Sequence, residues 1–413
     1  MKLTKVGALA AAAVFVFAAC GNTGGGGGGD KGTIEIWSSL PRQGSNKAQT
    51  DTIINAINMA LEEVGSKVGG YTITYVDKDD STAATGQWDE ATEIKNANDA
   101  VANDAVVAYI GTFNSGAAKL SIPILCKAGI VMVSPANTYP GLTKEGKGEA
   151  NEPGVYYPDG CTRNYTRVVP ADDLQGRAGA LWASQLGVTK AYVLDDTQLY
   201  GKGIADVFAA EAPGFGVEIL GRDGIDGKAT DYKALAEKIK AAGPELVYYG
   251  GITQNNAGQL WRDLRDALGT EVKLMGPDGI FEGEWLEAAG DAAEGSYITF
   301  GGVPPDQLTG DGKTFVDTYT AKYPNQPAEA YTAYGYEAAK VVIAAIERAA
   351  ATNPADNDAL RAAILKEVFA TKDYAGVLGT WSFNAEGDTS LTDMSGNIVT
   401  GGEFVFDKVI KEE

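Results

Sequence analysis

The chain alternates short β-rich segments with amphipathic helical segments, and it does so in two successive runs. In the first run, strand patterns cover residues 33–39, 71–80, 105–111, 129–135 and 163–169. A helical segment at 171–187 then opens a second run, whose strand patterns cover 190–196, 216–225, 245–251, 271–279 and 295–302. Alternation of this kind predicts parallel sheets joined by right-handed crossovers, which is the α/β class. The runs share no 20–50-residue sequence repeat, and 413 residues suit two domains.

The segments between these strands have helical periodicity. In 47–65, for example, Ile53, Ile54, Ile57 and Leu61 lie on one face. Further helices are expected at 90–104, 116–129, 231–243, 255–269, 314–323, 328–350 and 357–369, followed by a β-rich tail at 379–387 and 401–409.

The first 32 residues have the composition of an export signal and a linker. Residues 1–19 combine two lysines with a short apolar run, which is typical of a secretory signal peptide. The run FAAC is similar to the lipobox of bacterial lipoproteins, so Cys20 is the expected lipidation site; a secreted protein without lipid is the alternative. Residues 20–32 contain six consecutive glycines and are expected to form a flexible tether. We therefore expect an extracytoplasmic protein, periplasmic or on the cell surface, that contacts the membrane only through its lipid.

Charge and histidine content exclude several functions. The formal net charge of −21 argues against a nucleic-acid partner, because binding there depends on neutralising phosphates. The chain contains no histidine, which removes Ser-His-Asp and Cys-His catalysis and HExxH zinc sites. No G-x-G-x-x-G follows the first strand, and NSGAA is not a nucleophile elbow. We expect no enzyme activity, no cofactor and no metal.

Cys126 and Cys161 remain as an even pair once Cys20 is assigned to the lipid. In an oxidising compartment such a pair predicts a disulfide, with two buried free thiols as the alternative.

Small polar residues follow two neighbouring strands of the first run. Asn114 and Ser115 follow 105–111, and Ala136 and Thr138 follow 129–135. Ligands of open α/β sheets collect at the carboxyl ends of strands, so these hydroxyls and nearby N–H groups are candidates to hold a carboxylate. The alternatives are a plain helix cap at Ser115 and ordinary turn chemistry. Pro123 either kinks the helix that follows or delays its start.

Asp278 follows a strand of the second run, in LMGPDG. A carboxylate there is a natural partner for an ammonium group, although Pro-Asp-Gly is also a standard turn. The adjacent pairs Asp79 with Asp80 and Asp195 with Asp196 point to opposite sides of a strand, so we expect solvated strand ends rather than a metal or acid/base site.

The stretches from Ile110 to Thr143, VLDDTQLYGKG, ELVYYGGITQNNAGQLWRDLRDAL and KLMGPDGI together resemble the branched-chain amino acid-type solute-binding proteins of ABC transporters. The resemblance covers nearly everything after residue 32. It implies a type I periplasmic-binding fold, in which two Rossmann-like lobes are joined by three hinge crossings and trap a ligand between them. We expect one lobe from 33–168 and 300–388, the other from 169–299 and 389–413, and crossings near Val169, Phe300 and 385–395.

The resemblance also implies roles for single residues. Ser115 and Thr138 match the residues that bind the ligand carboxylate. Ala136 matches a residue whose carbonyl accepts a hydrogen bond from the ligand ammonium, and Asp278 matches the acid that pairs with it. Tyr200 and Tyr331 match aromatic residues that pack the ligand.

Some positions depart from the family pattern. Asp278 is one methylene shorter than the usual Glu, and Ile252 stands where an aromatic residue is common. Arg42 or Gln43 is a candidate to face a polar ligand group, and 146–162 looks like an insertion. These departures weaken the expectation that the ligand has an aliphatic side chain.

The sequence therefore predicts a monomeric, lipid-anchored receptor that captures a small zwitterion, an amino acid by preference, for the permease of an ABC importer. The alternatives are a binder of another small solute, such as an amide, an aromatic acid or a sugar, and a ligand sensor that does not transport.

Overall fold

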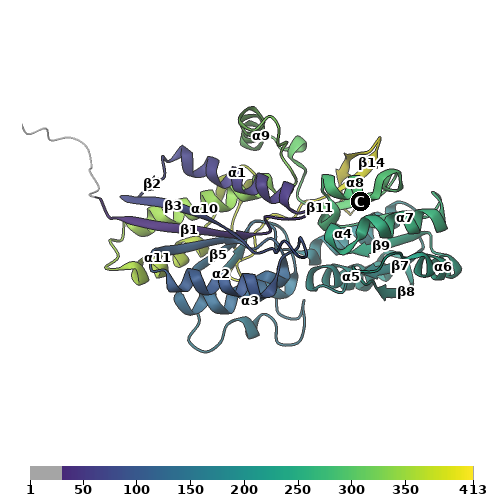
Figure 1. The fold of residues 1–413 in the computed structure, drawn as a ribbon, viewed down its shortest axis with the longest axis horizontal. Helices are drawn as coiled ribbons and strands as arrows, with labels where there is room; N and C mark the ends of the chain where they lie inside the picture. The colour runs from purple at the N-terminus through teal and green to yellow at the C-terminus, as the bar shows by residue number, and fades with distance from the viewer. Residues whose placement is uncertain (1–29, 413) are drawn as a thin grey trace, which may run out of the picture.

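The computed structural model describes residues 30–412 and has two α/β lobes side by side (Figure 1). The signal peptide, Cys20 and most of the tether lie outside the described residues. In the described part of the chain, no helix combines the length and the apolar character needed to cross a membrane.

The first lobe is built on a six-stranded sheet in the order β2-β3-β1-β4-β5-β6. Neighbouring strands run parallel except β2, which pairs antiparallel with β3. The central strands are almost wholly apolar and buried on both faces, as expected of a parallel sheet covered by helices. Its strands are β1 (Thr33–Leu40), β2 (Lys67–Val68), β3 (Tyr71–Asp79), β4 (Val106–Gly111), β5 (Val131–Ser134) and β6 (Tyr165–Arg167).

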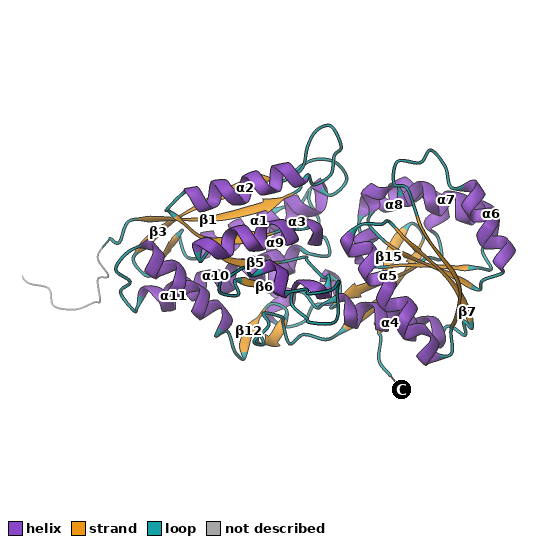
Figure 2. Ribbon diagram, turned by 90° about the horizontal axis from the view of Figure 1, so that it is seen from below, coloured by secondary structure: helices purple, strands orange, loops and turns teal. Residues whose placement is uncertain are grey.

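Helices cover both faces of this sheet (Figure 2). On one face α1 packs against α10 and α10 against α11, and on the other α2 packs against α3. Their bounds are α1 (Lys47–Glu63), α2 (Glu90–Ala102), α3 (Ser115–Leu125), α9 (Asp311–Lys322), α10 (Thr332–Ala350) and α11 (Asn357–Phe369). Pro123 does not delay α3; it lies in the last turn, and the helix ends two residues later.

The second lobe is built on a seven-stranded sheet in the order β15-β14-β11-β10-β9-β7-β8. The strands β7 to β11 are parallel, and β14 and β15 add an antiparallel edge. Its strands are β7 (Lys190–Asp195), β8 (Glu218–Gly224), β9 (Leu246–Gly250), β10 (Lys273–Gly276), β11 (Tyr297–Gly301), β14 (Met394–Thr400) and β15 (Glu403–Val409). Its helices are α4 (Asp172–Gln185), α5 (Leu199–Glu211), α6 (Lys233–Ala242), α7 (Ala257–Leu268) and α8 (Gly283–Ala289).

The chain passes between the two sheets three times: between β6 and α4, after β11, and before β14. β11 runs through Phe300 to Gly301 before the chain returns to the first lobe. Strand β14 was not among the predicted strands, because SLTDMSGNIVT lacks a run of large apolar residues. The predicted strand at 379–387 is only a short pair, β12 (Tyr374–Gly376) with β13 (Gly379–Trp381).

The expectation that the acidic pairs are solvated is wrong for three of the four residues. Asp80, Asp195 and Asp196 are buried, and only Asp79 is partly exposed. Loops after neighbouring strands fold over these strand ends. Asp196 accepts hydrogen bonds from the backbone N–H of Ile252 (3.2 Å) and from Nδ2 of Asn255 (2.7 Å). Burial raises the pKa of Asp196 to about 6.

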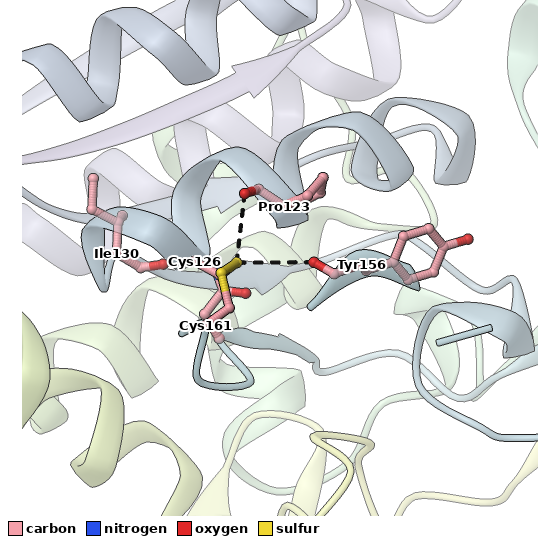
Figure 3. Close-up of a disulfide and its surroundings, with 6 residues drawn as sticks. Pro123, Cys126, Ile130, Tyr156 and Cys161 are labelled. Atoms are coloured by element: carbon pink, nitrogen blue, oxygen red, sulfur yellow. Dashed lines mark hydrogen bonds between the residues drawn. A yellow bond between two sulfur atoms is a disulfide. The ribbon is translucent and has the colours of Figure 1, made fainter. Parts of the chain in front are cut away.

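The expected disulfide between Cys126 and Cys161 is present, with Cα atoms 5.4 Å apart. Figure 3 shows that it fastens the end of α3 to the segment that carries Tyr156. Within the expected insertion 146–162, Glu152 is buried and accepts hydrogen bonds from the hydroxyls of Tyr139 (2.8 Å) and Tyr156. The insertion is therefore an ordered part of the first lobe.

Candidate functional site

Loops after three neighbouring strands of each sheet meet at one pocket between the lobes. In the first lobe they follow β1, β4 and β5, and in the second they follow β7, β9 and β10. The atom-free space here, counted together with open solvent at the mouth, is about 370 Å³, and about 30 Å³ can take up the centre of a water molecule. The pocket lining consists of Asn46, Gln49, Phe113, Asn114, Ser115, Ala136, Thr138, Tyr200, Ile252, Asp278, Gly279, Glu282 and Tyr331.

All eight residues predicted to bind the ligand lie in this lining: Asn114, Ser115, Ala136, Thr138, Tyr200, Ile252, Asp278 and Tyr331. The structure thus brings them together from both lobes, and their role in binding stays a prediction. Arg42 and Gln43 do not line the pocket. Arg42 instead pairs with Asp51 (2.7 Å) and Asp77 (3.0 Å), and Gln43 donates to Asp79 (2.7 Å).

The two loops of the first lobe are braced against each other. The Ser134 hydroxyl donates to the carbonyl of Thr112 (2.9 Å), and the Asn137 amide donates to that of Phe113 (2.8 Å). The backbone N–H of Tyr139 donates to Oγ of Ser115 (3.3 Å). These bonds hold Ser115 and Thr138 at the same edge of the sheet.

The start of α3 lies at this edge. Asn114 is its N-cap and Ser115 its first residue. The Asn114 side chain makes no cap hydrogen bond, and the alternative interpretation of Ser115 as a plain helix cap is not met. The first turn of a helix leaves backbone N–H groups free, and its dipole favours an anion. Oδ1 of Asn114 and Oγ1 of Thr138 are buried and find no hydrogen-bond partner among residues 30–412. The site therefore offers unused polar groups to a ligand.

Asp278, from the other lobe, is surrounded by neutral donors. Gln175 and Tyr200 each donate to its Oδ1 at 2.8 Å, and Tyr331 donates to its Oδ2. Burial raises the pKa of Asp278, and these hydrogen bonds oppose that rise. The bond from Tyr331 crosses between the lobes, because the helix that follows Tyr331, α10, packs in the first lobe.

Asp172, the first residue of α4, is a second acid at this place that the sequence did not single out as a site residue. It is fully buried, its backbone N–H donates to the carbonyl of Thr138 (2.9 Å), and neither side-chain oxygen has a partner in the described chain. Burial and repulsion from Asp278 raise its pKa well above the usual value. Two buried acids that lack a cation are costly to ionise, so a positively charged ligand group would be stabilised here.

Sequence reasoning also missed Asn46, Gln49, Phe113 and Glu282. Asn46 precedes α1 and Gln49 lies in its first turn, at the carboxyl end of β1; Glu282 follows β10 and is the N-cap of α8. The rule that ligands collect at the carboxyl ends of strands applies to them as well as to Ser115. After β1 the predicted residues were Arg42 and Gln43, whereas the pocket is lined by Asn46 and Gln49 a few positions further along the chain.

The arrangement suits a small molecule with separated charges. One side offers hydroxyls and the N-terminus of a helix, and the other offers buried carboxyl groups. None of the described residues lining the pocket is Lys or Arg. Among residues 30–412 there is also no group of three or more acids or cysteines arranged to hold a metal ion.

Two α/β lobes with a polar pocket between their strand ends define a two-lobed solute-binding protein. The family profile described as "Periplasmic binding protein" matches residues 33–396, and the chain belongs to this family. Among its relatives, it is 30% identical to the Leu/Ile/Val-binding protein homolog 2 of Brucella abortus, over 87% of this chain and 88% of that one. It is 28% identical to the amino acid binding protein of Pseudomonas aeruginosa, over 86% of each chain.

Solved structures agree on the fold. The leucine binding protein LivK of Thermotoga maritima superposes with a TM-score of 0.77 at 27% identity, covering 91% of this chain and 98% of that one. A solute binding protein of R. palustris in complex with benzoate gives a TM-score of 0.75 at 19% identity, covering 92% and 96%. The fold is thus the type I periplasmic-binding fold, and relatives of this fold hold chemically different ligands.

Proposed function

We propose that this protein captures an α-amino acid between its two lobes and delivers it to the permease of an ABC importer. The observation that carries the proposal is that the Ser115 hydroxyl and the unpartnered hydroxyl of Thr138 line one pocket with the buried acid Asp278 of the opposite lobe. Neither lobe alone supplies both ends of a zwitterion site.

The carboxylate of the amino acid binds at the start of α3. The hydroxyls of Ser115 and Thr138 donate to it, together with free backbone N–H groups of the first helical turn. Each such charge-assisted bond contributes about 1.5–3 kcal/mol. Asn114, the N-cap, borders this end.

The ammonium group of the amino acid binds between the carbonyl of Ala136 and the carboxylate of Asp278. The buried and unpartnered carboxyl group of Asp172 lies next to this position and adds to the negative potential. Binding an ammonium here compensates acids that are costly to keep ionised in the empty pocket. Tyr200 and Tyr331 hold Asp278 and, with Ile252, pack against the rest of the ligand.

Capture depends on movement of one lobe against the other. We assign 33–168 with 300–388 to one lobe and 169–299 with 389–413 to the other, with hinges near Val169, Phe300 and 385–395. Since the ligand touches both lobes only in the closed form, it favours that form by its differential affinity. The permease then recognises the closed form.

We further propose that the protein is a monomer anchored through lipidated Cys20.

A thermal-shift screen of the purified protein tests the proposal. At a concentration of 100 times the dissociation constant, a true ligand adds about 2.7 kcal/mol to the free energy of unfolding. We expect α-amino acids to raise the melting temperature, and the same ligand concentration to give a smaller shift with Asp278→Asn. A screen in which no α-amino acid acts while benzoate or a sugar does would overturn the proposal.

A further inference from the structure

The pocket lining includes three buried polar side chains that contact one another and that the zwitterion does not need. Asn46 and Gln49, from the start of α1, are each 2% exposed, and Glu282, from the N-cap of α8, is 1% exposed. The Nδ2 of Asn46 and the Nε2 of Gln49 each lie 3.4 Å from Oε2 of Glu282, so this contact also joins the two lobes. We call Asn46, Gln49 and Glu282 the distal cluster.

The carboxyl group of Glu282 has only weak and neutral partners. Besides the two long amide contacts, Nε2 of Gln254 donates to its Oε1 at 3.2 Å. The charged groups that act on Glu282 are two further acids, Glu284 and Glu329, and both oppose its ionisation. Burial raises the pKa of Glu282 to about 8. A buried carboxylate in such surroundings is stabilised by a cation more than by anything the chain supplies.

Gln49 adds an acceptor that has no donor. Its Oε1 is buried and has no hydrogen-bond partner within the part of the chain that the structure describes. An aliphatic ligand side chain placed here would leave the Gln49 oxygen without a donor, at a cost of about 1–3 kcal/mol, and the Glu282 carboxyl group without a cation. A ligand group that carries several N–H donors and a positive charge satisfies both.

From this placement we propose that the distal cluster selects amino acids whose side chain ends in a cationic group, with Glu282 as the residue that determines specificity. The inference rests on the proposed capture of an α-amino acid and states which class of amino acid is captured. Asp278 and Glu282, four residues apart on the same loop of the second lobe, then receive the two positive charges of one ligand.

The test is isothermal titration calorimetry with pairs of amino acids that differ only at the chain end. Ornithine is compared with norvaline, and lysine with norleucine, on the wild type, on Glu282→Gln and on Glu284→Gln. Glu284 is a matched control: it repels Glu282 from two residues further along but does not line the pocket, so its removal should not reduce the preference. The diamine 1,4-diaminobutane, which has no carboxylate, is included as a probe of the acids alone. Melting temperatures of the empty variants establish that they fold.

We expect at least one cationic amino acid to bind about tenfold or more tightly than its aliphatic partner. Glu282→Gln should remove this preference and leave the affinity for the aliphatic partner nearly unchanged, while Glu284→Gln keeps the preference. Equal or tighter binding of the aliphatic partner, or a preference that survives Glu282→Gln, overturns the inference and leaves the proposed function standing. Binding of the diamine that depends on Glu282, without binding of any α-amino acid, supports the cluster and overturns the proposed function. Absence of binding by all five compounds overturns the inference.

Discussion

At the scale of single residues, Asp278 receives hydrogen bonds from Gln175, Tyr200 and Tyr331 and lies beside the buried Asp172. Its neutral neighbours keep the carboxyl group in place without supplying a positive charge. The ligand is therefore expected to supply it.

We predict that Asp278→Asn weakens amino acid binding by about 10- to 150-fold, because a charge-assisted bond of about 1.5–3 kcal/mol is lost. The change keeps the shape of the side chain and removes its charge. Titration calorimetry at neutral pH measures the loss. The exposed acid Asp291 provides the control, and Asp291→Asn should leave the affinity unchanged. Wild-type affinity in Asp278→Asn would contradict the assigned role.

At the scale of elements, the β5 loop is held in place by Arg167 on β6. Its guanidinium is fully buried, pairs with Asp388 at 2.6 Å, and donates to the carbonyls of Tyr139 (2.8 Å) and Asn137 (3.3 Å). These carbonyls flank Thr138. Burial alone would raise the pKa of the Asp388 carboxyl group, but the Arg167 guanidinium holds this pKa below its usual value.

We predict that Arg167→Ala lowers the free energy of unfolding by about 3–5 kcal/mol, because it leaves the Asp388 carboxylate buried and unpaired. Urea denaturation measures this loss. The control is Arg177→Ala, whose pairs with Glu211 and Glu412 are exposed and contribute at most about 1 kcal/mol. Equal losses in the two variants would show that Arg167 has no special structural role.

The disulfide closes the segment that contains the β5 loop and the insertion. The two cysteines are 35 residues apart, and a loop of that length stabilises the folded state by about 3–4 kcal/mol on the chain-entropy model. We predict a loss of this size when Cys126 and Cys161 are both changed to Ser, measured by urea denaturation. The same loss should follow chemical reduction of the wild type. An unchanged midpoint in both experiments would contradict the prediction.

Spacing and strand endings were sufficient to predict the elements that carry Ser115, Thr138 and Asp278, because each follows an apolar strand directly. They were not sufficient for Glu282 and Gln49. These two residues come together only through contact between the lobes, and neither spacing nor periodicity encodes that contact. Asp196 was misjudged for a related reason: its burial is caused by the loop after β9, which is more than 50 residues away in the chain.

At the scale of the whole molecule, several acids are buried without a cation. Burial raises the pKa values of Glu93 to about 7, Asp196 to about 6 and Glu282 to about 8. The folded state therefore binds more protons than the unfolded chain, whose carboxyl groups titrate near pH 4. Stability consequently falls as pH rises through this range.

We predict that the melting temperature of the empty protein rises as pH is lowered from 8 toward about 5. Below that range, loss of ionised groups with depressed pKa values, such as Asp388, lowers it again. Melting curves by circular dichroism at single pH steps measure this profile. Glu282→Gln should flatten the profile across the whole range from about pH 5 to 8, because wild-type Glu282 keeps its proton in the folded state and loses it in the unfolded chain. A melting temperature that falls steadily from pH 8 to pH 5 would contradict the prediction.

The central claim is that opposite lobes hold the two charged ends of one α-amino acid. Titration calorimetry of the wild type with an α-amino acid that binds, and with its two analogues lacking either the amino or the carboxyl group, tests it most directly. The account predicts one binding site per chain for the amino acid and a loss of about tenfold or more in affinity for each analogue. An analogue without the amino group that binds as tightly as the amino acid itself would contradict it.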